Sequence, residues 1–343
     1  MELAPIVLFV YNRLWHTQKT IEALQKNELA SKSELFIYAD GAKSKKSSTQ
    51  VLEVRNYIKK VDGFSKVTII ERDKNWGLAA NIIDGVTNVV NQYGKIIVME
   101  DDLVTSPYFL KFMNDALKFY KNEPKVWHVS GYTPPLKGIK QHFFIKPTTC
   151  WGWATWDDRW IHFKKDTKNI LNKFDEKRIS DFNMNKTYDY YSHIVLNHDN
   201  KINTWAIFWY ATSYFNNGLS LHPKKSFVQN IGHDGSGTHC GDGCSFDVQL
   251  SMTYENTFPC DISIKKEVTD ILESYYKRLK LSFLKRSINK IVRIIKGKKN
   301  DGNKFIAQSF KRKASLAIVN KIQNKFNNKH QIKVKNTLKF LTD

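Results

Sequence analysis

The sequence contains few cysteines. Four occur among 343 residues, and this number is too small for a disulfide framework in a chain of this length. His239, Cys240 and Cys244 would supply three zinc ligands but leave the fourth position without a candidate. We therefore expect reduced thiols, and a zinc site only as a less favoured alternative.

Long apolar runs are also lacking. No segment approaches the roughly 18 to 20 consecutive apolar residues that a membrane-spanning helix requires. The apolar stretch from Pro5 to Val10 is too short for the hydrophobic core of a signal peptide. We therefore expect a cytoplasmic protein.

Acidic residues are scarce in the C-terminal part of the chain. The whole sequence has 54 Lys and Arg against 33 Asp and Glu, and 22 of the basic but 5 of the acidic residues follow Asp261. Leu281, Leu284, Ile288, Ile291 and Ile295 repeat at intervals of three and four, which predicts an amphipathic basic helix. A second such helix is expected over residues 305–326. We expect residues 262–343 to form a basic helical tail that binds an anionic membrane surface.

Strands alternate with helices in the first third of the chain. Apolar runs of strand length occur at residues 5–10, 35–39, 67–70 and 95–99. Helical spacing of apolar residues follows each of the first three runs, as in Ile82, Ile83, Val86 and Val90. This alternation predicts an α/β fold with parallel strands and flanking helices. The alternation fades in the aromatic middle third, and we expect a mixed region packed on the first sheet.

Polar residues follow each expected strand. Ligands of parallel sheets bind at the carboxyl ends of the strands, and the most distinctive group there is Glu100-Asp101-Asp102. Three crowded carboxylates repel one another, and a divalent cation with oxygen ligands relieves that repulsion. If the segment is extended, Asp101 should point away from Glu100 and Asp102. The alternative is a solvated acidic turn next to a helix.

Five motifs lie in a fixed order along the chain. They are Pro5 to Arg13, Asn75-Trp76-Gly77-Leu78, Glu100 to Leu103, Cys150 to Trp156 and Thr238-His239. With these motifs the chain resembles bacterial family 2 glycosyltransferases of surface-polysaccharide clusters over residues 3–260, and the acidic motif is also similar to that of eukaryotic N-acetylglucosaminyltransferases acting on mannose. The resemblance implies the GT-A fold, a metal-dependent transfer from a UDP-sugar and a bacterial surface glycan as acceptor, with inversion at the sugar.

The resemblance also implies roles for individual residues. The metal, Mn²⁺ or Mg²⁺, is expected at Asp102 and His239, whereas Glu100 and Asp101 face the nucleotide sugar. The nucleotide is expected to contact Tyr11, Asn12, Arg13, Asp40, Asn75, Gly77 and Asn81. A plain loop histidine is the alternative for His239. The resemblance also implies a nucleotide-sugar-binding half over residues 1–130 and an acceptor-side half over 131–261.

An inverting transfer needs a carboxylate that accepts the proton of the acceptor hydroxyl. No acidic residue flanks Trp205, where the resemblance leads us to expect one. Asp157, Asp158 and Asp199 remain as candidate bases, and of these we select Asp158, followed by Asp157. The alternative is that they pair with Arg159 or Lys164 on a surface turn.

Two other functions compete with glycosyl transfer. A nucleic-acid-binding protein would use the basic tail, but the first 261 residues are nearly neutral and contain no zinc finger or RNA-binding motif. A sugar nucleotidyltransferase would have a glycine-rich loop after the first strand, and Tyr11-Asn12-Arg13-Leu14 contains no glycine. We therefore expect a UDP-sugar and a glycan or lipid-linked glycan as partners, and no nucleic acid.

Overall fold

The structure, a computed structural model, describes residues 2–234 and 246–280. The chain forms two compact units, residues 1–277 and 278–343, and the fold below is that of the first unit. Residues 266–280 are helical, and Val268 and Leu272 of this helix are buried against Phe143 and Ile145. The first unit therefore includes residues beyond 261. The two predicted basic helices lie outside the described residues.

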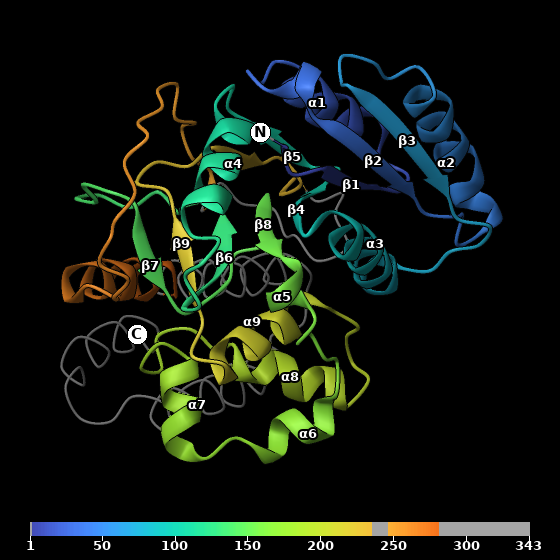
Figure 1. Ribbon diagram of the computed structural model, residues 1–343. Coiled ribbons are helices and arrows are strands. Elements are labelled where there is room, and N and C mark those ends of the chain that lie inside the picture. The colour runs from blue at the N-terminus through green and yellow to red at the C-terminus, as the bar shows by residue number, and fades with distance from the viewer. Residues whose placement is uncertain (1, 235–245, 281–343) are drawn as a thin grey trace, which may run out of the picture. The chain divides into compact units, whose positions relative to one another are not determined.

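A single mixed sheet forms the centre of this unit (Figure 1). Within the described residues it has eight strands in the order β3-β2-β1-β4-β8-β6-β9-β7. Two short strands pair antiparallel beside it, β5 (Leu103–Thr105) and β10 (Val228–Asn230). The strands of the large sheet are β1 (Ile6–Val10), β2 (Glu34–Ala39), β3 (Lys66–Glu71), β4 (Lys95–Glu100), β6 (Val126–Ser130), β7 (Phe143–Ile145), β8 (Trp153–Trp156) and β9 (Leu219–His222).

The first four strands confirm the expected parallel arrangement. Ile6 of β1 lies opposite Leu35 of β2 and Ile97 of β4, and β3 pairs parallel with β2. All of β1 is buried, because helices cover both faces of the sheet. The carboxyl ends of β1 to β4 consequently lie along one edge, where Glu100 ends β4.

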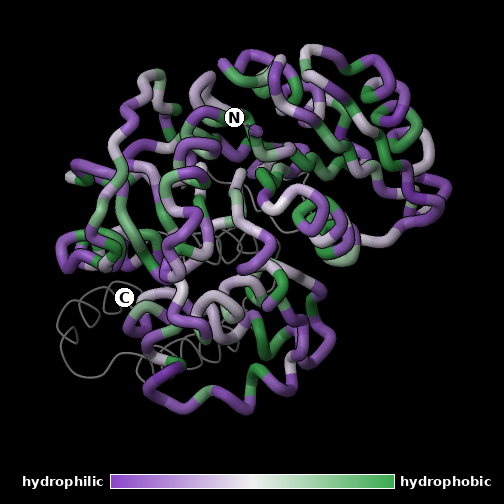
Figure 2. The backbone as a smooth tube through the Cα atoms, viewed as in Figure 1, coloured by the Kyte–Doolittle hydropathy of each residue, from purple (hydrophilic) through white to green (hydrophobic). Residues whose placement is uncertain are grey.

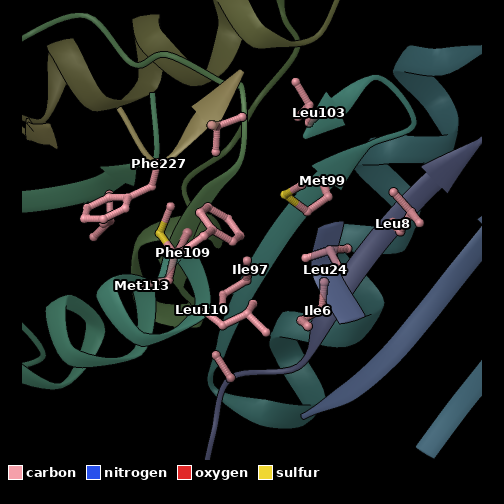
Figure 3. Close-up of a cluster of buried hydrophobic side chains, with 14 of the residues drawn as sticks. Ile6, Leu8, Leu24, Ile97, Met99, Leu103, Phe109, Leu110, Met113 and Phe227 are labelled. Atoms are coloured by element: carbon pink, nitrogen blue, oxygen red, sulfur yellow. The ribbon is translucent and has the colours of Figure 1, made fainter. Parts of the chain in front are cut away.

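Helices form a layer on each face of the sheet. On one face, Ile6 and Leu8 point toward Leu24 and Leu110, as Figure 3 shows. On the other face, Val7 and Phe9 pack with residues of α3. Figure 2 shows mixed colours along helices such as α2, as expected where one side of a helix is buried. The first layer contains α1 (Leu14–Gln25), α2 (Lys45–Ile58) and α4 (Phe109–Phe119); the second contains α3 (Leu78–Tyr93), α5 (Asp157–Trp160) and α9 (Ala206–Phe215).

The middle third continues the sheet, whereas we expected it to pack on the sheet. Strand β8 pairs antiparallel with β4, with Lys95 opposite Trp156 and Val98 opposite Trp153. Pairing satisfies the backbone groups that β4 would otherwise leave open at an edge. A small helical layer with its own apolar cluster follows, formed by α6 (Thr167–Asn172), α7 (Glu176–Phe182), α8 (Tyr191–His198) and α9. Among the described residues, no helix is both long and apolar enough to span a membrane.

Candidate functional site

The acidic triplet lies where β4 ends and the chain turns into β5. Asp101 and Asp102 are 5% and 7% exposed, so both carboxylates are largely buried. The hydroxyl of Thr20 on α1 donates to the Asp101 carbonyl at 2.8 Å and accepts from the Leu103 amide at 3.1 Å. One threonine side chain thus fixes the backbone of the turn from a neighbouring helix.

Arg13 joins the two aspartates. Its Nη2 atom pairs with Asp101 and with Asp102, the latter at 2.8 Å. We expected Asp101 to point away from its neighbours, and this is wrong, because residues 101 and 102 form a turn. Both carboxylates therefore converge on one guanidinium.

The pKa values of this group reflect burial and crowding. Burial raises the pKa of Glu100 above its usual range, and the charges of Asp102 and Asp101 raise it further. Burial likewise raises the pKa of Asp101, while Arg13 partly offsets the shift. Burial alone would lower the pKa of Arg13, but the two carboxylates outweigh it and raise that pKa. The site has more negative than positive groups.

The segment over residues 230–234, which we call the glycine segment, passes close to Asp102. The Ile231 amide donates to the Asp102 carbonyl at 2.9 Å, and the Asn230 side chain accepts from the Gly232 amide at 2.8 Å. A Cβ atom on Gly232 would lie 2.1 Å from Asp102 Oδ2. Only glycine lets the backbone pass this close to the carboxylate. The glycine-containing sequence continues to Gly243, and residues 235–243 lie outside the described residues.

His16 connects α1 to the same segment. Its Nε2 atom lies 3.1 Å from Asp234 Oδ2, and the imidazole is buried while Asp234 is exposed. His16 and Thr20 are four residues apart, so they share one side of α1, and Arg13 directly precedes this helix. Sequence reasoning missed His16 and Thr20, although this spacing after Arg13 was a signal that could have found them.

Asp40 holds the loop that follows β3. Its carboxylate accepts from the amides of Trp76 at 2.8 Å and Gly77 at 3.0 Å, and from the Asn75 side chain at 3.0 Å. The Gly41 amide donates to it as well, at 2.9 Å. The structure therefore brings Asp40, Asn75 and Gly77 together, and it gives the Asp40 carboxylate a structural task in this loop.

The other residues predicted for the nucleotide lie near this edge with partners of their own. The Tyr11 hydroxyl accepts from the Lys43 amide at 3.2 Å, and the Asn12 amide group donates to Gln50 at 3.3 Å. Asn81 is buried at the start of α3 and accepts from Arg72 Nε at 2.9 Å. These three residues are thus oriented by neighbouring helices and loops.

Asp157 and Asp158 lie near the amino end of β4, whereas the acidic triplet lies at its carboxyl end. Our selection of these two aspartates as bases beside the triplet is therefore corrected. They follow β8, which runs antiparallel to β4, and the Asp157 amide donates to the Gly94 carbonyl before β4 begins. The length of β4, roughly 16 Å at 3.3 Å per residue, separates that edge from Glu100. Asp158 pairs with Arg159 instead, which was the alternative for these residues.

The two predicted metal ligands, Asp102 and His239, are described only in part. His239 lies outside the described residues, as do Cys240 and Cys244. Among residues 2–234 and 246–280, no three His, Cys, Asp or Glu side chains cluster in a way that would hold a metal ion. Asp102 has hard oxygen donors suited to Mg²⁺ or Mn²⁺, but one of its oxygens is paired with Arg13. A cation at Asp102 therefore has to share this carboxylate with Arg13 or displace it.

An aromatic group lies next to the glycine segment. The half-buried Trp151 ring meets Tyr132, His233 and Phe246 edge-on, at centroid distances of 4.6, 5.4 and 5.8 Å. We call these four residues the aromatic wall. The neighbouring tryptophans of the same motif, Trp153 and Trp156, are buried in the core. The motif thus contributes one ring to the site and the others to packing.

The buried His128 holds the backbone next to the aromatic wall. Trp209 Nε1 donates to His128 Nδ1 at 3.1 Å, so His128 Nε2 carries the proton and donates to the Thr149 carbonyl at 3.1 Å. The Ser130 hydroxyl donates to the same carbonyl at 3.2 Å. Burial, together with the nearby His222, lowers the pKa of His128 to about 3. The neutral ring therefore fixes the backbone two residues before Trp151.

Part of the chain matches the model of a known protein family. Residues 6–132 match the model of glycosyl transferase family 2. The matched segment contains β1 to β4, Arg13, Asp40 and the acidic triplet. This match and the α/β fold with its mostly parallel sheet support a family 2-like glycosyltransferase. A search of curated proteins gives no match.

Three solved structures that match parts of this chain do so at low identity and low TM-score. The mannosyltransferase PcManGT from Pyrobaculum calidifontis, in complex with GDP-Man and Mn²⁺, is 10% identical, with 62% of this chain and 72% of that chain covered and a TM-score of 0.32. TarS of S. aureus is 12% identical, with 67% and 37% covered and a TM-score of 0.38. Mouse xyloside xylosyltransferase 1 is 8% identical, with 62% and 81% covered and a TM-score of 0.34.

Proposed function

We propose that this protein is a metal-dependent glycosyltransferase that uses a UDP-sugar donor. The observation that carries the proposal is the convergence of Arg13, Asp101 and Asp102 at the carboxyl end of β4, within the segment that matches glycosyl transferase family 2. Ligands of parallel sheets bind at this edge. A guanidinium next to hard carboxylate oxygens suits a diphosphate with its divalent cation.

Each part of the site has a proposed task. Arg13 binds the diphosphate, and Tyr11, Asn12 and the loop held by Asp40 surround the nucleoside. Asp102 holds Mn²⁺ or Mg²⁺, with His239 as a further ligand and Glu100 and Asp101 as neighbouring charges. The bound cation would stabilise the negative charge on the departing diphosphate. Asn81, Asn75 and Gly77 keep the loop after β3 and the start of α3 in place.

The aromatic wall is proposed to face the transferred sugar or the acceptor. Sugar rings have apolar faces, and indole and imidazole rings offer flat surfaces against which these faces pack. His233 of the wall directly follows Gly232, where an added Cβ atom would lie 2.1 Å from Asp102 Oδ2. This position suits a hexosyl or N-acetylhexosaminyl group attached to a diphosphate held by Arg13.

The acceptor is proposed to be a hydroxyl of a bacterial surface glycan, such as lipopolysaccharide or capsule, carried on a lipid. The basic segment 262–343 would then hold the enzyme at the cytoplasmic face of the membrane, where each Lys or Arg near the surface contributes about 1 kcal/mol. Flotation of the full chain with phosphatidylglycerol vesicles tests this. Binding that persists after Lys285, Arg286, Lys290 and Arg293 are changed to Gln, or equal binding to phosphatidylcholine vesicles, would contradict it.

Calorimetric titration with UDP tests the proposed donor site. We expect UDP binding that requires Mn²⁺ and that weakens by about 100-fold in Asp102→Asn, since a metal ligand is lost. Asp270→Asn is the matched control, because Asp270 forms an exposed pair with Lys266 on the helix over residues 266–280. Absence of UDP binding by the wild type at millimolar concentration, with and without Mn²⁺, would overturn the proposal.

A further inference from the structure

The Arg13 guanidinium supplies a positive charge within the acidic site. Its Nη2 atom contacts Asp101 and Asp102, and the three side chains are 20%, 8% and 10% exposed. Among the described residues, Arg13 is the basic side chain that pairs with these two carboxylates. Buried carboxylates need a compensating positive charge, and here the chain supplies it.

Part of the guanidinium has no partner among the described residues. Arg13 Nη1 is buried and has no hydrogen-bond partner among residues 2–234 and 246–280. A guanidinium presents a planar fork of donors that matches two oxygens of a phosphate. Arg13 thus uses one nitrogen for two carboxylates and keeps part of its fork free of partners in the described structure.

We propose that Arg13 is an internal counter-ion that competes with the divalent cation for Asp102. The inference rests on the proposed function in one respect, namely that the ligand which draws Arg13 away is a nucleoside diphosphate. In the absence of a nucleotide, Arg13 neutralises the aspartates and keeps the metal affinity low. When a diphosphate binds the guanidinium, Asp102 becomes free for the cation.

Exchange of partners makes the two ligands cooperative. A cation that binds Asp102 releases Arg13 toward the phosphates, and a diphosphate that binds Arg13 releases Asp102 toward the cation. By linkage, each ligand then raises the affinity for the other by the same factor. A site of plain crowded carboxylates would instead bind the cation tightly without any nucleotide.

Titration of the full chain with MnCl₂ alone tests the competition. We expect Arg13→Gln to bind Mn²⁺ about tenfold or more tightly than the wild type, because the buried carboxylates lose their counter-ion. The added Asp102→Asn change should remove that gain. Arg178→Gln is the matched control, since Arg178 pairs with Asp175 at the surface and should leave Mn²⁺ binding unchanged. Arg13→Gln binding Mn²⁺ no better than the wild type would overturn the inference.

A thermal-shift measurement guards against a folding defect. Arg13→Gln should unfold at a lower temperature than the wild type in chelator, and MnCl₂ should raise its midpoint more than that of the wild type. Arg13→Lys, which keeps the charge but not the fork, should have an intermediate Mn²⁺ affinity. A lysine variant that behaves as Arg13→Gln does would contradict the role of charge.

The linkage to nucleotide is tested separately. Wild-type Mn²⁺ affinity should rise with UDP, and Arg13→Gln should show a smaller rise. If UDP does not bind the wild type at all, the proposed function fails while the MnCl₂ titration still decides the competition. If UDP raises the Mn²⁺ affinity of Arg13→Gln as much as that of the wild type, the exchange of partners is wrong and the metal-dependent donor site stands.

Discussion

The two halves of the central sheet differ in where they carry polar groups. In the parallel half, β3-β2-β1-β4, the strands are apolar and the charged groups gather beyond their carboxyl ends. In the other half, β8-β6-β9-β7, polar side chains lie inside the core, and His128 and His222 are fully buried within β6 and β9. The first arrangement gathers charged groups at the carboxyl ends of the strands, whereas the second uses neutral histidine rings to hold the backbone in place.

Two pairs of adjacent aspartates, one in each half of the sheet, show the same difference. Asp101-Asp102 follows β4 and Asp157-Asp158 follows β8, and a member of each pair contacts an arginine. The Asp102 side chain is 10% exposed, whereas that of Asp158 is 62% exposed. Strand direction therefore decides which pair belongs to a site, and similar local sequence does not.

The largest expected effect is acid destabilisation that originates in the histidine-containing half. Burial lowers the pKa of His128 to about 3 and those of His222 and His142 to about 4. The unfolded chain takes up these protons near pH 6.5, so it binds more protons than the folded state between about pH 6.5 and 4. The free energy of unfolding should therefore decrease as the pH is lowered from about 6.5 to 4, and His222 alone should account for a decrease of roughly 3 kcal/mol.

Urea unfolding between pH 7 and 4.5 measures this effect. His222→Gln should cost stability at pH 7 because His222 Nδ1 donates a hydrogen bond to the Tyr132 carbonyl at 3.0 Å, but the stability of the variant should vary less with pH than that of the wild type. Equal pH dependence in both proteins would show that His222 titrates normally in the folded state.

The next effect compares the two acid pairs directly. Asp102→Asn should weaken Mn²⁺-dependent UDP binding by about 100-fold, since it removes a proposed ligand. Asp158→Asn should change it less than about twofold and cost under about 1 kcal/mol of stability, as for an exposed ion pair. Isothermal titration and urea unfolding of both variants give the comparison. A large binding loss in Asp158→Asn would remove the distinction between the two edges.

Gly232→Ala tests the close approach at the acidic edge. The new methyl group would meet Asp102 Oδ2 at 2.1 Å, so the segment or the carboxylate has to move. We expect UDP affinity in the presence of Mn²⁺ to fall by about tenfold, consistent with an overpacking cost of 1–3 kcal/mol. An unchanged affinity would mean that the segment over residues 230–234 can shift without disturbing the site.

The smallest effect concerns the aromatic wall. Trp151→Leu should leave UDP affinity within about twofold while weakening the binding of UDP-sugars, by up to about tenfold where a ring contact of 0.5–1.5 kcal/mol is lost. Competition of a panel of UDP-sugars against UDP measures the difference. Trp156→Phe is the control, because Trp156 is buried in the core. Equal losses for UDP and UDP-sugars in Trp151→Leu would place the ring at the nucleotide.

Much of the first half of the fold follows from the sequence. Residues 5–10, 35–39, 67–70 and 95–99 are all strands with small changes at the ends, because buried parallel strands are apolar throughout. The polar residues after these strands meet at one edge, because parallel strands end on the same side. Arg13 and the acidic triplet were found in this way.

Other features required the folded chain. The antiparallel direction of β8, which moves Asp157 and Asp158 away from the site, depends on which edge accepts the strand and leaves no local mark in the sequence. The pairing of His16 with Asp234 joins residues 218 positions apart in sequence. The turn at residues 101–102 overrides the alternation expected for an extended segment, since Thr20 fixes its backbone.

The sequence by itself determined the α/β class, the parallel half of the sheet and the position of the acidic edge. These properties depend on hydrophobic periodicity and on polar residues at strand ends, both of which are local. Only the tertiary structure decided that Arg13 pairs with Asp102, that Gly232 lies over the carboxylate and that Trp151 stays at the site while Trp153 enters the core. Contacts between residues distant in sequence depend on strand direction and packing, which local patterns do not encode.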